Sequence, residues 1–519
     1  MTILNLDTLL FKDAIEQTIS NPISSHCWHR LKDCYQKMDD ERLKQLMTNH
    51  LQAQTPRTGV AGFLRATWLF SMLNSDSHLI EAGHIIQTID PRDTDRLTAY
   101  LAFVWAIMLK KVNDRAGIIT FANDACLPDV LQILRQSLIQ RCTERPVKRK
   151  IDKIKKVAII MPSINGYPHA PTAMALDQAR VLIDQEIQVA LFTCHDTFIP
   201  DMQHFFGAGE KILRDIFNFA DWGSHCLPGI TLYQGSEQFS VMRRWIDMLT
   251  HIKHFDPDLV MSIGFYSPLI ASVYESRPTL ALNVHSVAPL DKVDVWLCAS
   301  AEDAGKTHKQ WGEDLSSGIG WHHPYRIKRE QNMSKLSRQD LALSLSSVVL
   351  ISIGFRLEEE ISGAWALNMN QVLKSYPHII WLLVGGAGKI PVALSQTPTS
   401  QVKAMATQTD IAALFQCCDI YVNPPRIGGG FSVAEAMAEG LPVVTYNDSD
   451  GGVKVGDVAA SSDEEYFAKL VALINDIELR KETGKTMQTI FSNTLDLDKS
   501  GPSLLGACDL ALECFMKRS

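Results

Sequence analysis

The sequence lacks the features of an integral membrane protein and of a secreted, disulfide-rich protein. Its longest apolar run, residues 97–109, falls well short of the about 20 residues that a membrane-spanning helix needs. The N-terminus has no basic segment followed by a long apolar stretch, which argues against a secretory signal. The 11 cysteines are odd in number and form no Cys-x-x-Cys pair, so neither a disulfide framework nor a zinc site is predicted. We therefore expect a cytoplasmic protein.

An excess of basic charge is also lacking. The chain has 50 Lys and Arg residues against 58 Asp and Glu residues, whereas a general nucleic-acid-binding protein needs positive charge to neutralise phosphates. We expect no nucleic-acid partner. With 46% hydrophobic and 21% charged residues the composition is that of a folded globular protein, and 519 residues are too many for one core.

Three regions follow one another along the chain. Residues 1–145 place apolar side chains at helical spacing, as at Leu64 and Trp68, and predict an all-helical N-terminal domain, either a bundle or degenerate helix-hairpin repeats. Short apolar strands then alternate with helices in residues 146–335 and again in residues 336–519. This alternation predicts an α/β fold class with two doubly wound, Rossmann-like domains that face a shared cleft.

The junction between the first two regions is strongly basic. It contains Arg145, Lys148, Arg149, Lys150, Lys153, Lys155 and Lys156. A solvated linker is one interpretation. A contact with anionic lipid or an acidic glycan is the other, since each such charge near anionic lipid contributes about 1 kcal/mol. The second interpretation would place the protein peripherally at the inner face of the membrane.

The most informative segment, residues 423–444, consists of a strand, a glycine loop and a helix. Ligands bind at the carboxyl ends of strands in doubly wound sheets, and this loop follows such an end. Gly428, Gly429 and Gly430 allow close backbone approach, and the helix start offers N–H groups to an anion. Glu435, one turn into the helix, can accept hydrogen bonds from two vicinal hydroxyls. A phosphate and a ribose at these positions would make a nucleotide site.

A second interpretation of the same segment needs no ligand. Ser432-x-x-Glu435 also fits a capping box, in which Glu435 folds back to the start of its own helix. A cap does not require three consecutive glycines, however. We therefore favour ligand binding and include Ser432 in the candidate site.

This segment resembles the nucleotide-sugar-binding signature of GT-B glycosyltransferases, especially the retaining glycosyl transferases group 1 (family 4). Their pattern is roughly E-G-F-G-x-x-x-x-E-A-M-A-x-G-x-P-V-V. The resemblance implies that Glu435 holds the donor ribose, whereas Ile427 stands where the family has its first glutamate. It covers residues 347–460 well, residues 157–300 by pattern only, and the N-terminal region not at all.

A second stretch carries the same resemblance. Residues 348–360 are similar to the opening strand of the family's C-terminal domain, which implies that Arg356 binds the donor diphosphate. A guanidinium suits this role because it can bind two phosphate oxygens at once. A surface salt bridge with residues 358–360 is the alternative. Ile361 replaces the family's lysine, and Lys454 is a candidate for the missing charge.

Two histidines and one further glycine complete the candidate site. His169 lies between a strand end and a helix start, in a loop that the resemblance places near donor phosphate and acceptor. His285 also follows a strand, and a histidine can act as general base for an acceptor hydroxyl, although a retaining mechanism needs none. Packed structural histidines are the alternative for both. Gly385, at the end of another strand, is expected to flank the nucleotide base.

The resemblance implies a retaining, metal-independent hexosyltransferase that uses a nucleotide-diphosphate sugar. The acceptor would be a glycan, a lipid-linked or a protein acceptor, as in the synthesis of surface polysaccharides and glycoconjugates. We expect no cofactor beyond the donor substrate, since cationic side chains and a helix dipole can stabilise the leaving diphosphate. A nucleotide-sugar epimerase and a non-catalytic adaptor subunit are the alternatives on this fold. The residues at 427 and 361 favour the adaptor, whereas Arg356 and Glu435 favour the transferase.

Overall fold

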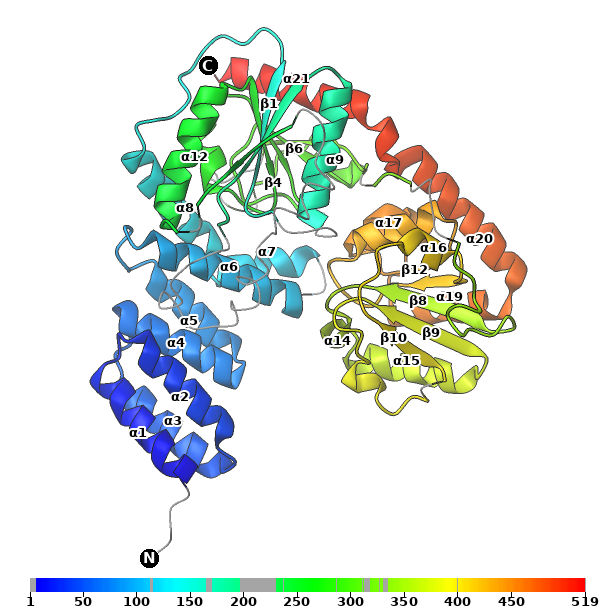
Figure 1. The fold of residues 1–519 in the computed structure, drawn as a ribbon, viewed down its shortest axis with the longest axis horizontal. Helices are drawn as coiled ribbons and strands as arrows, with labels where there is room; N and C mark the ends of the chain where they lie inside the picture. The colour runs from blue at the N-terminus through cyan, green and yellow to red at the C-terminus, as the bar shows by residue number, and fades with distance from the viewer. Residues whose placement is uncertain are drawn as a thin grey trace, which may run out of the picture.

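The computed structural model contains an all-helical unit and two α/β units, each α/β unit built on a parallel sheet (Figure 1). It describes residues 6–112, 115–164, 170–196, 230–236, 238–285, 287–309, 311, 318–325, 327–329, 335–398 and 400–518. The predicted fold class, with its all-helical first part, is confirmed.

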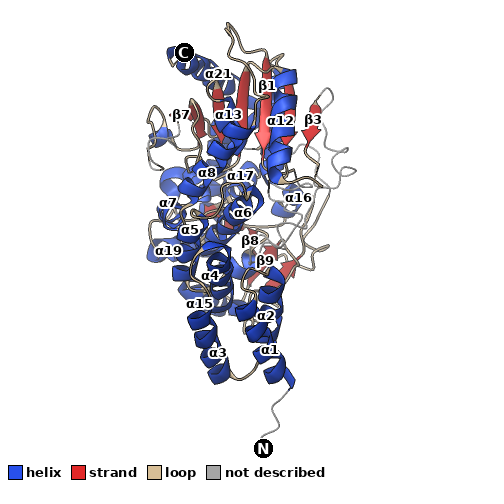
Figure 2. Cartoon of the chain, turned by 90° about the vertical axis from the view of Figure 1, so that its left-hand side faces the viewer, coloured by secondary structure: helices blue, strands red, loops and turns tan. Residues whose placement is uncertain are grey.

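The helical unit divides into two packed groups. Trp28 and Trp68, with ring centroids 6.1 Å apart, lie in a small core formed by the first four helices. The later helices join a larger core that also covers the first sheet. Figure 2 shows α1–α3 at the end of the molecule opposite the chain's last helix. The helices are α1 (Leu6–Ser20), α2 (Ser25–Lys37), α3 (Glu41–Gln54), α4 (Gly59–Leu73), α5 (Asp76–Ile86), α6 (Thr94–Lys111), α7 (Arg115–Asp124) and α8 (Leu127–Arg141).

The first α/β unit holds a seven-stranded sheet in the order β3-β2-β1-β4-β5-β6-β7, with parallel neighbours throughout. All carboxyl ends therefore lie at one edge. Its elements are β1 (Lys156–Met161), α9 (Ala170–Asp184), β2 (Gln188–Thr193), β3 (Thr231–Gln234), α12 (Val241–Phe255), β4 (Leu259–Ile263), α13 (Pro268–Val273), β5 (Thr279–Leu282), β6 (Val295–Cys298) and β7 (Ile319–His322).

Alternating side chains of each strand enter two different cores. In β1, Val157 and Ile159 pack with α9, whereas Ala158 and Ile160 point to the face that α12 and the helical unit cover. Successive strand residues point to opposite faces of a sheet, so a strand buried on both faces is apolar throughout. The continuous apolar runs of this unit thus follow from its two-sided burial.

A buried ion pair fastens the helical unit to the first sheet. Arg135 of α8 contacts Asp291 and donates a hydrogen bond to the carbonyl of Leu290 at 3.1 Å. Both charged side chains are almost fully buried, at 3% and 1% exposure. Because the core is continuous across this contact, the helical unit packs as one body with the first sheet.

The second α/β unit holds a five-stranded parallel sheet in the order β10-β9-β8-β11-β12. Two separate helices follow β8, because Gly363, the first residue of α15, has a positive φ (+63°) that does not continue α14. The elements are β8 (Val348–Ile353), α14 (Leu357–Glu360), α15 (Gly363–Ser375), β9 (Ile379–Val384), β10 (Val402–Met405), α16 (Ile411–Phe415), β11 (Ile420–Val422), α17 (Gly430–Ala438), β12 (Val443–Val444), α18 (Asp450–Val455), α19 (Asp463–Asn475), α20 (Ile477–Ile490) and α21 (Gly501–Lys517).

The chain crosses between the two α/β units twice. After α20 it returns to the first unit, where α21 packs against α9 and β5 (Figure 1). The returning segment lies beside the outgoing one: Ile327 and Asp496 form a parallel bridge, and the N–H of Leu497 donates to the carbonyl of Ile327 at 2.9 Å. The last helix, which the sequence grouped with residues 336–519, therefore stabilises the first sheet.

The basic junction after α8 lies along the first α/β unit, and several of its charges have acidic partners. Arg149 donates to Asp258 at 2.6 Å and to Asp256 at 3.2 Å, and Lys150 pairs with Asp152 at 3.0 Å. These contacts favour the linker interpretation. Among the described helices, none combines the length and the apolar character needed to cross a bilayer.

Candidate functional site

The loops at the carboxyl ends of β8, β9 and β11 meet at one edge of the second sheet. Gly354 and Gly385 approach each other there, since a side chain at Gly385 (φ +131°) would collide with the carbonyl of Gly354. The parallel order places β8 between β9 and β11, so residues from three distant segments converge. This edge is where ligands bind in doubly wound sheets.

Arg426, after β11, organises this edge. Its guanidinium donates to Asn423 at 2.9 Å, to Glu360 at 2.9 Å and to the carbonyl of Ile353 at 2.8 Å. The side chain is 4% exposed. Burial lowers and Glu360 raises the pKa of Arg426, with a net rise, so the group stays charged. Arg426 is thus a structural cation that ties the ends of β8 and β11 together.

A chain of hydrogen bonds continues from Arg426 to the glycine loop. Arg426 donates to the hydroxyl of Tyr421 at 3.2 Å, and that hydroxyl lies 2.7 Å from the hydroxyl of Ser432. Ser432 donates in turn to the carbonyl of Gly429 at 3.0 Å. Burial raises the pKa of Tyr421, which keeps its phenol protonated as a donor. Ser432 therefore links the glycine loop to Tyr421 by hydrogen bonds.

Each of the three loop glycines makes room for a cation. A side chain at Gly429 (φ +84°) would lie 2.5 Å from Nε of Arg426, and one at Gly430 would meet Nζ of Lys454. At Gly428 the nearest atom would be Nη2 of Arg356, at 3.4 Å. The glycine run concentrates positive charge around the start of α17 by removing the side chains that would separate the cations.

Arg356 forms the ion pair that the sequence offered as the alternative to diphosphate binding. Its Nη2 lies 3.1 Å from Oε1 of Glu360, which is the ion pair with a neighbouring glutamate. Its side chain is nevertheless 32% exposed beside Gly428, and its Nε has no hydrogen-bond partner in the described part of the chain. Arg356 thus retains donor capacity toward an anion at the loop, held in place by Glu360.

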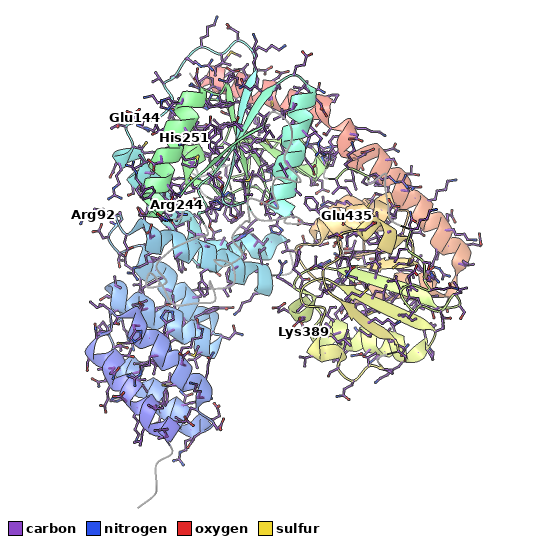
Figure 3. All side chains as sticks on the ribbon, in the orientation of Figure 1. Arg92, Glu144, Arg244, His251, Lys389 and Glu435 are labelled. Atoms are coloured by element: carbon purple, nitrogen blue, oxygen red, sulfur yellow. The ribbon has the colours of Figure 1, made fainter. Side chains whose placement is uncertain are left out.

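The capping-box interpretation of α17 is wrong. The helix begins at Gly430 with Gly429 as its N-cap, so Ser432 lies inside the helix and no side chain caps its start. The first N–H groups of α17 therefore stay available to an anion. Glu435 is half-buried on α17, on the side of the second unit that faces the first (Figure 3).

His285 joins the two α/β units at this edge. Its Nδ1 lies 3.1 Å from Oδ2 of Asp450, the first residue of α18. Both side chains are nearly buried, at 11% and 4% exposure. The ring of Trp105, from α6, packs against the imidazole with centroids 5.3 Å apart. The structure thus brings His285 to the glycine loop, because the N–H of Asp450 donates to the carbonyl of Ile427.

The sequence and the fold of the chain are similar to those of known glycosyltransferases. Residues 350–476 match the family described as glycosyl transferases group 1. The match lies within the second α/β unit, which we call the group 1 domain. A mutant of the O-GlcNAc transferase of Thermobaculum terrenum aligns over 100% of both chains with a TM-score of 0.54 and 11% identity, a likeness of fold. WaaG, a glycosyltransferase involved in lipopolysaccharide biosynthesis, aligns over 67% of this chain and 98% of its own, with a TM-score of 0.42 and 14% identity. Comparison of the sequence with curated proteins finds no match.

The chain therefore has the GT-B fold with a helical unit in front, and its departures from the group 1 signature have structural reasons. Ile427, in place of the first glutamate, is 1% exposed and belongs to the apolar core of the helical and first α/β units. Ile361, in place of the lysine, is 1% exposed and lies in the core of the group 1 domain. Lys454 reaches the glycine loop from α18 instead.

The remaining predicted residues of this GT-B chain divide into two groups. Gly385 is required by the close approach of the β8 and β9 ends, which accounts for it without a ligand. His169 lies outside the described residues. Sequence reasoning missed Arg426 and Asp450, and the only local signals for them are a charged residue after Pro424-Pro425 and the Asp-Gly-Gly-x-Lys spacing.

Proposed function

We propose that the protein transfers a sugar from a nucleotide-diphosphate sugar to a glycan, lipid-linked or protein acceptor. The observation that carries the proposal is the set of three cations gathered by three glycines at the uncapped start of α17. A diphosphate matches this arrangement in charge and geometry. Burial at the sheet edge strengthens each such charge-assisted hydrogen bond, which is worth about 1.5–3 kcal/mol.

The donor would bind mainly to the group 1 domain. Arg356 and Lys454 would contact the diphosphate from either side of the glycine loop, and Glu435 would accept hydrogen bonds from the ribose. Gly385, at the end of β9, would border the nucleotide base. Ser432 would act through the loop that it supports, since its hydroxyl is engaged with Tyr421 and Gly429.

The acceptor would approach from the first α/β unit, near His285 and His169. The group 1 resemblance implies retention at the anomeric carbon, and the cations provide charge for a leaving diphosphate without a metal. Among the residues that the structure describes, no group of three or more His, Cys, Asp and Glu side chains is arranged to hold a metal ion. We place the reaction in the synthesis of surface polysaccharide or another glycoconjugate, with peripheral membrane contact through the exposed lysines of the basic junction.

A thermal-shift screen tests the donor site. Purified protein is heated with UDP, GDP, CMP or ADP, with and without Mg²⁺, alongside the Arg356→Ala and Glu435→Ala variants. A ligand at 100 times its Kd stabilises by about 2.7 kcal/mol, which is readily visible. Glu482→Ala, an exposed change on α20 of the same domain, is the control. We expect a metal-independent shift from one diphosphate, lost in both site variants and kept in the control.

The same screen separates the alternatives. A protein that no nucleotide stabilises would be an adaptor and not a transferase. A nucleotide-sugar epimerase would convert its donor without an acceptor, so sugar products recovered with the nucleotide still attached would identify it. Proton NMR of the released or transferred sugar gives the anomer and so tests retention.

A further inference from the structure

The contact between His285 and Asp450 joins an acceptor-side residue to a donor-side helix. His285 follows β5 of the first α/β unit, whereas Asp450 begins α18 of the second. The two are 165 positions apart in sequence, yet their side chains meet at 3.1 Å. We propose that Asp450 is a positioning residue that sets the orientation and proton placement of His285, so that Nε2 of His285 accepts the proton of the acceptor. This inference rests on the sugar transfer of the proposed function and departs from it in the anomer that is formed.

The hydrogen bond determines which ring nitrogen is free. A carboxylate only accepts hydrogen bonds, so a neutral imidazole beside Asp450 carries its proton on Nδ1 and its lone pair on Nε2. In the described part of the chain, Nε2 of His285 forms no hydrogen bond. The geometry thus holds the histidine in the tautomer that a general base needs and leaves the basic nitrogen open to a substrate.

Contacts from all three units fix the ring. The plane of Trp105, from the helical unit, is tilted 58° to the imidazole at 5.3 Å, and Trp105 itself stacks on Phe265 at 4.5 Å. The backbone N–H of His285 donates to Asn283 at 3.3 Å. Among the described residues, Asp450 supplies the only carboxylate that contacts the ring, and Lys454 lies one turn beyond Asp450. The imidazole therefore has one supported orientation.

The helix that carries Asp450 also reaches the donor site. One turn after Asp450, Nζ of Lys454 lies against Gly430 and donates to the carbonyl of Asp450 at 3.1 Å. Ser449 caps α18 by accepting from the N–H of Gly452 at 2.9 Å, which fixes the start of the helix. One short, well-anchored helix therefore connects the cation beside the diphosphate with the carboxylate that holds the base.

The step that this arrangement supports is a direct displacement. The acceptor hydroxyl oxygen forms a bond to the anomeric carbon while the bond from that carbon to the diphosphate oxygen breaks. The hydroxyl proton passes to Nε2 of His285, and the electron pair of the broken bond leaves on the diphosphate, where Arg356 and Lys454 offset its charge. Such a displacement inverts the anomeric centre, so it predicts the anomer opposite to the one that the group 1 resemblance implies.

Three variants test the inference: Asp450→Asn, His285→Gln and, as a matched control, Asp448→Asn. Asp448 is exposed in the same loop, so its change removes the same charge without touching His285. Each variant is measured for binding of the nucleoside diphosphate found in the screen and for release of that diphosphate from its glucose and N-acetylglucosamine conjugates, with water as acceptor. Nitrogen-15 NMR of histidine-labelled protein reports the tautomer, and loss of one signal in His285→Gln assigns it.

We expect Asp450→Asn to bind the diphosphate normally and to lower kcat on the order of 100-fold with unchanged KM, with His285 losing its single Nδ1–H tautomer. His285→Gln should lose the acid limb of the pH–rate profile, and Asp448→Asn should match the parent. The inference is overturned if Asp450→Asn behaves like Asp448→Asn, if His285 carries its proton on Nε2, or if the product anomer is retained. Absence of any nucleotide binding would instead refute the proposed function.

Discussion

The guanidinium of Arg426 occupies the space that a side chain at Gly429 would need. Nε of Arg426 lies 2.5 Å from the position of a Cβ atom there, and Gly429 adopts φ +84°, a conformation that other residues rarely take. The glycine and the arginine are thus mutually dependent. Because Arg426 also holds Glu360, the loop and the ion pair of Arg356 respond to a change at either residue.

Gly429→Ala should therefore cost more than backbone strain. A left-handed conformation costs about 1–2 kcal/mol for a residue with a Cβ atom, and displacement of Arg426 adds to it. Gly305→Ala is the control, since Gly305 has φ +74° and no atom within 4 Å of the added methyl. We expect urea unfolding to show a larger loss of unfolding free energy for Gly429→Ala than for the control. The rise in thermal midpoint caused by the nucleotide should vanish only in Gly429→Ala. Equal losses in the two variants would contradict the dependence on Arg426.

Lys454→Met should weaken binding of the nucleoside diphosphate without affecting binding of the nucleoside. Its Nζ lies beside Gly430, so the variant loses a charge-assisted hydrogen bond of about 1.5–3 kcal/mol, or roughly 10- to 150-fold in affinity. Isothermal titration of the nucleoside diphosphate and of the nucleoside measures this directly. Lys374→Met, exposed on α15, is the control. An unchanged diphosphate affinity would remove Lys454 from the donor site.

Breaking the Arg135–Asp291 pair should destabilise the junction between the helical and first α/β units. Asp291→Asn leaves a buried arginine without its counter-charge, which costs about 3–5 kcal/mol, whereas Arg135→Met with Asp291→Leu together should cost less than the single change. Asp247→Asn, in the exposed pair with Arg243, should cost under about 1 kcal/mol. Urea unfolding followed by tryptophan fluorescence checks all three. A double variant as unstable as Asp291→Asn would contradict the expectation.

His195 and Asp196, after β2, should have opposite effects on the pH dependence of stability. Burial and then Arg244 lower the pKa of His195 to about 4, against about 6.5 in an unfolded chain. The folded state therefore loses stability through His195 as the pH falls from about 6.5 to about 4, because the unfolded chain binds a proton there and the folded chain does not. Burial raises the pKa of Asp196 to about 6, against about 3.9 unfolded, so the folded state gains stability as the pH falls through the same range. The two effects oppose each other in the parent protein.

Variants at these two positions separate the effects. Asp196→Asn leaves only the histidine, so its thermal midpoint should fall more steeply than the parent's as the pH drops from 6.5 to 4. His195→Asn leaves only the carboxyl and should show a flatter or reversed slope; asparagine tolerates the left-handed conformation of His195 (φ +51°). Parallel pH curves for the parent and both variants would contradict the shifted pKa values.

The fold was largely predictable because its signals are local. Strands such as β1 and β8 are buried on both faces, and the continuous apolar residues of each strand already indicate that burial. The break between α14 and α15 depends on the conformation of Gly363, which a helical pattern does not reveal. The return of α21 to the first sheet depends on contacts with α9 and β5, elements more than 200 residues earlier in the chain.

The site was predictable only where a local motif exists. Arg356 and Glu435 lie in stretches whose spacing resembles a known signature; the structure places Arg356 beside Gly428 and Glu435 on α17, and their ligand roles stay predictions. Arg426 and Asp450 have no such signal, because their roles depend on Glu360 and His285, partners that only the folded chain brings near. The capping-box alternative fails for a different reason: the pattern at Ser432 is common, and the N-cap of α17 is Gly429 instead.

The paired segments at Ile327 and Asp496 make the link between the α/β units a double-stranded hinge. Two hydrogen-bonded segments restrain the link more than a single segment would, so any separation of the units would pivot about this pair. His285 and Asp450 belong to different α/β units, so a spin-label or fluorophore pair placed across their contact would measure any separation of the two units.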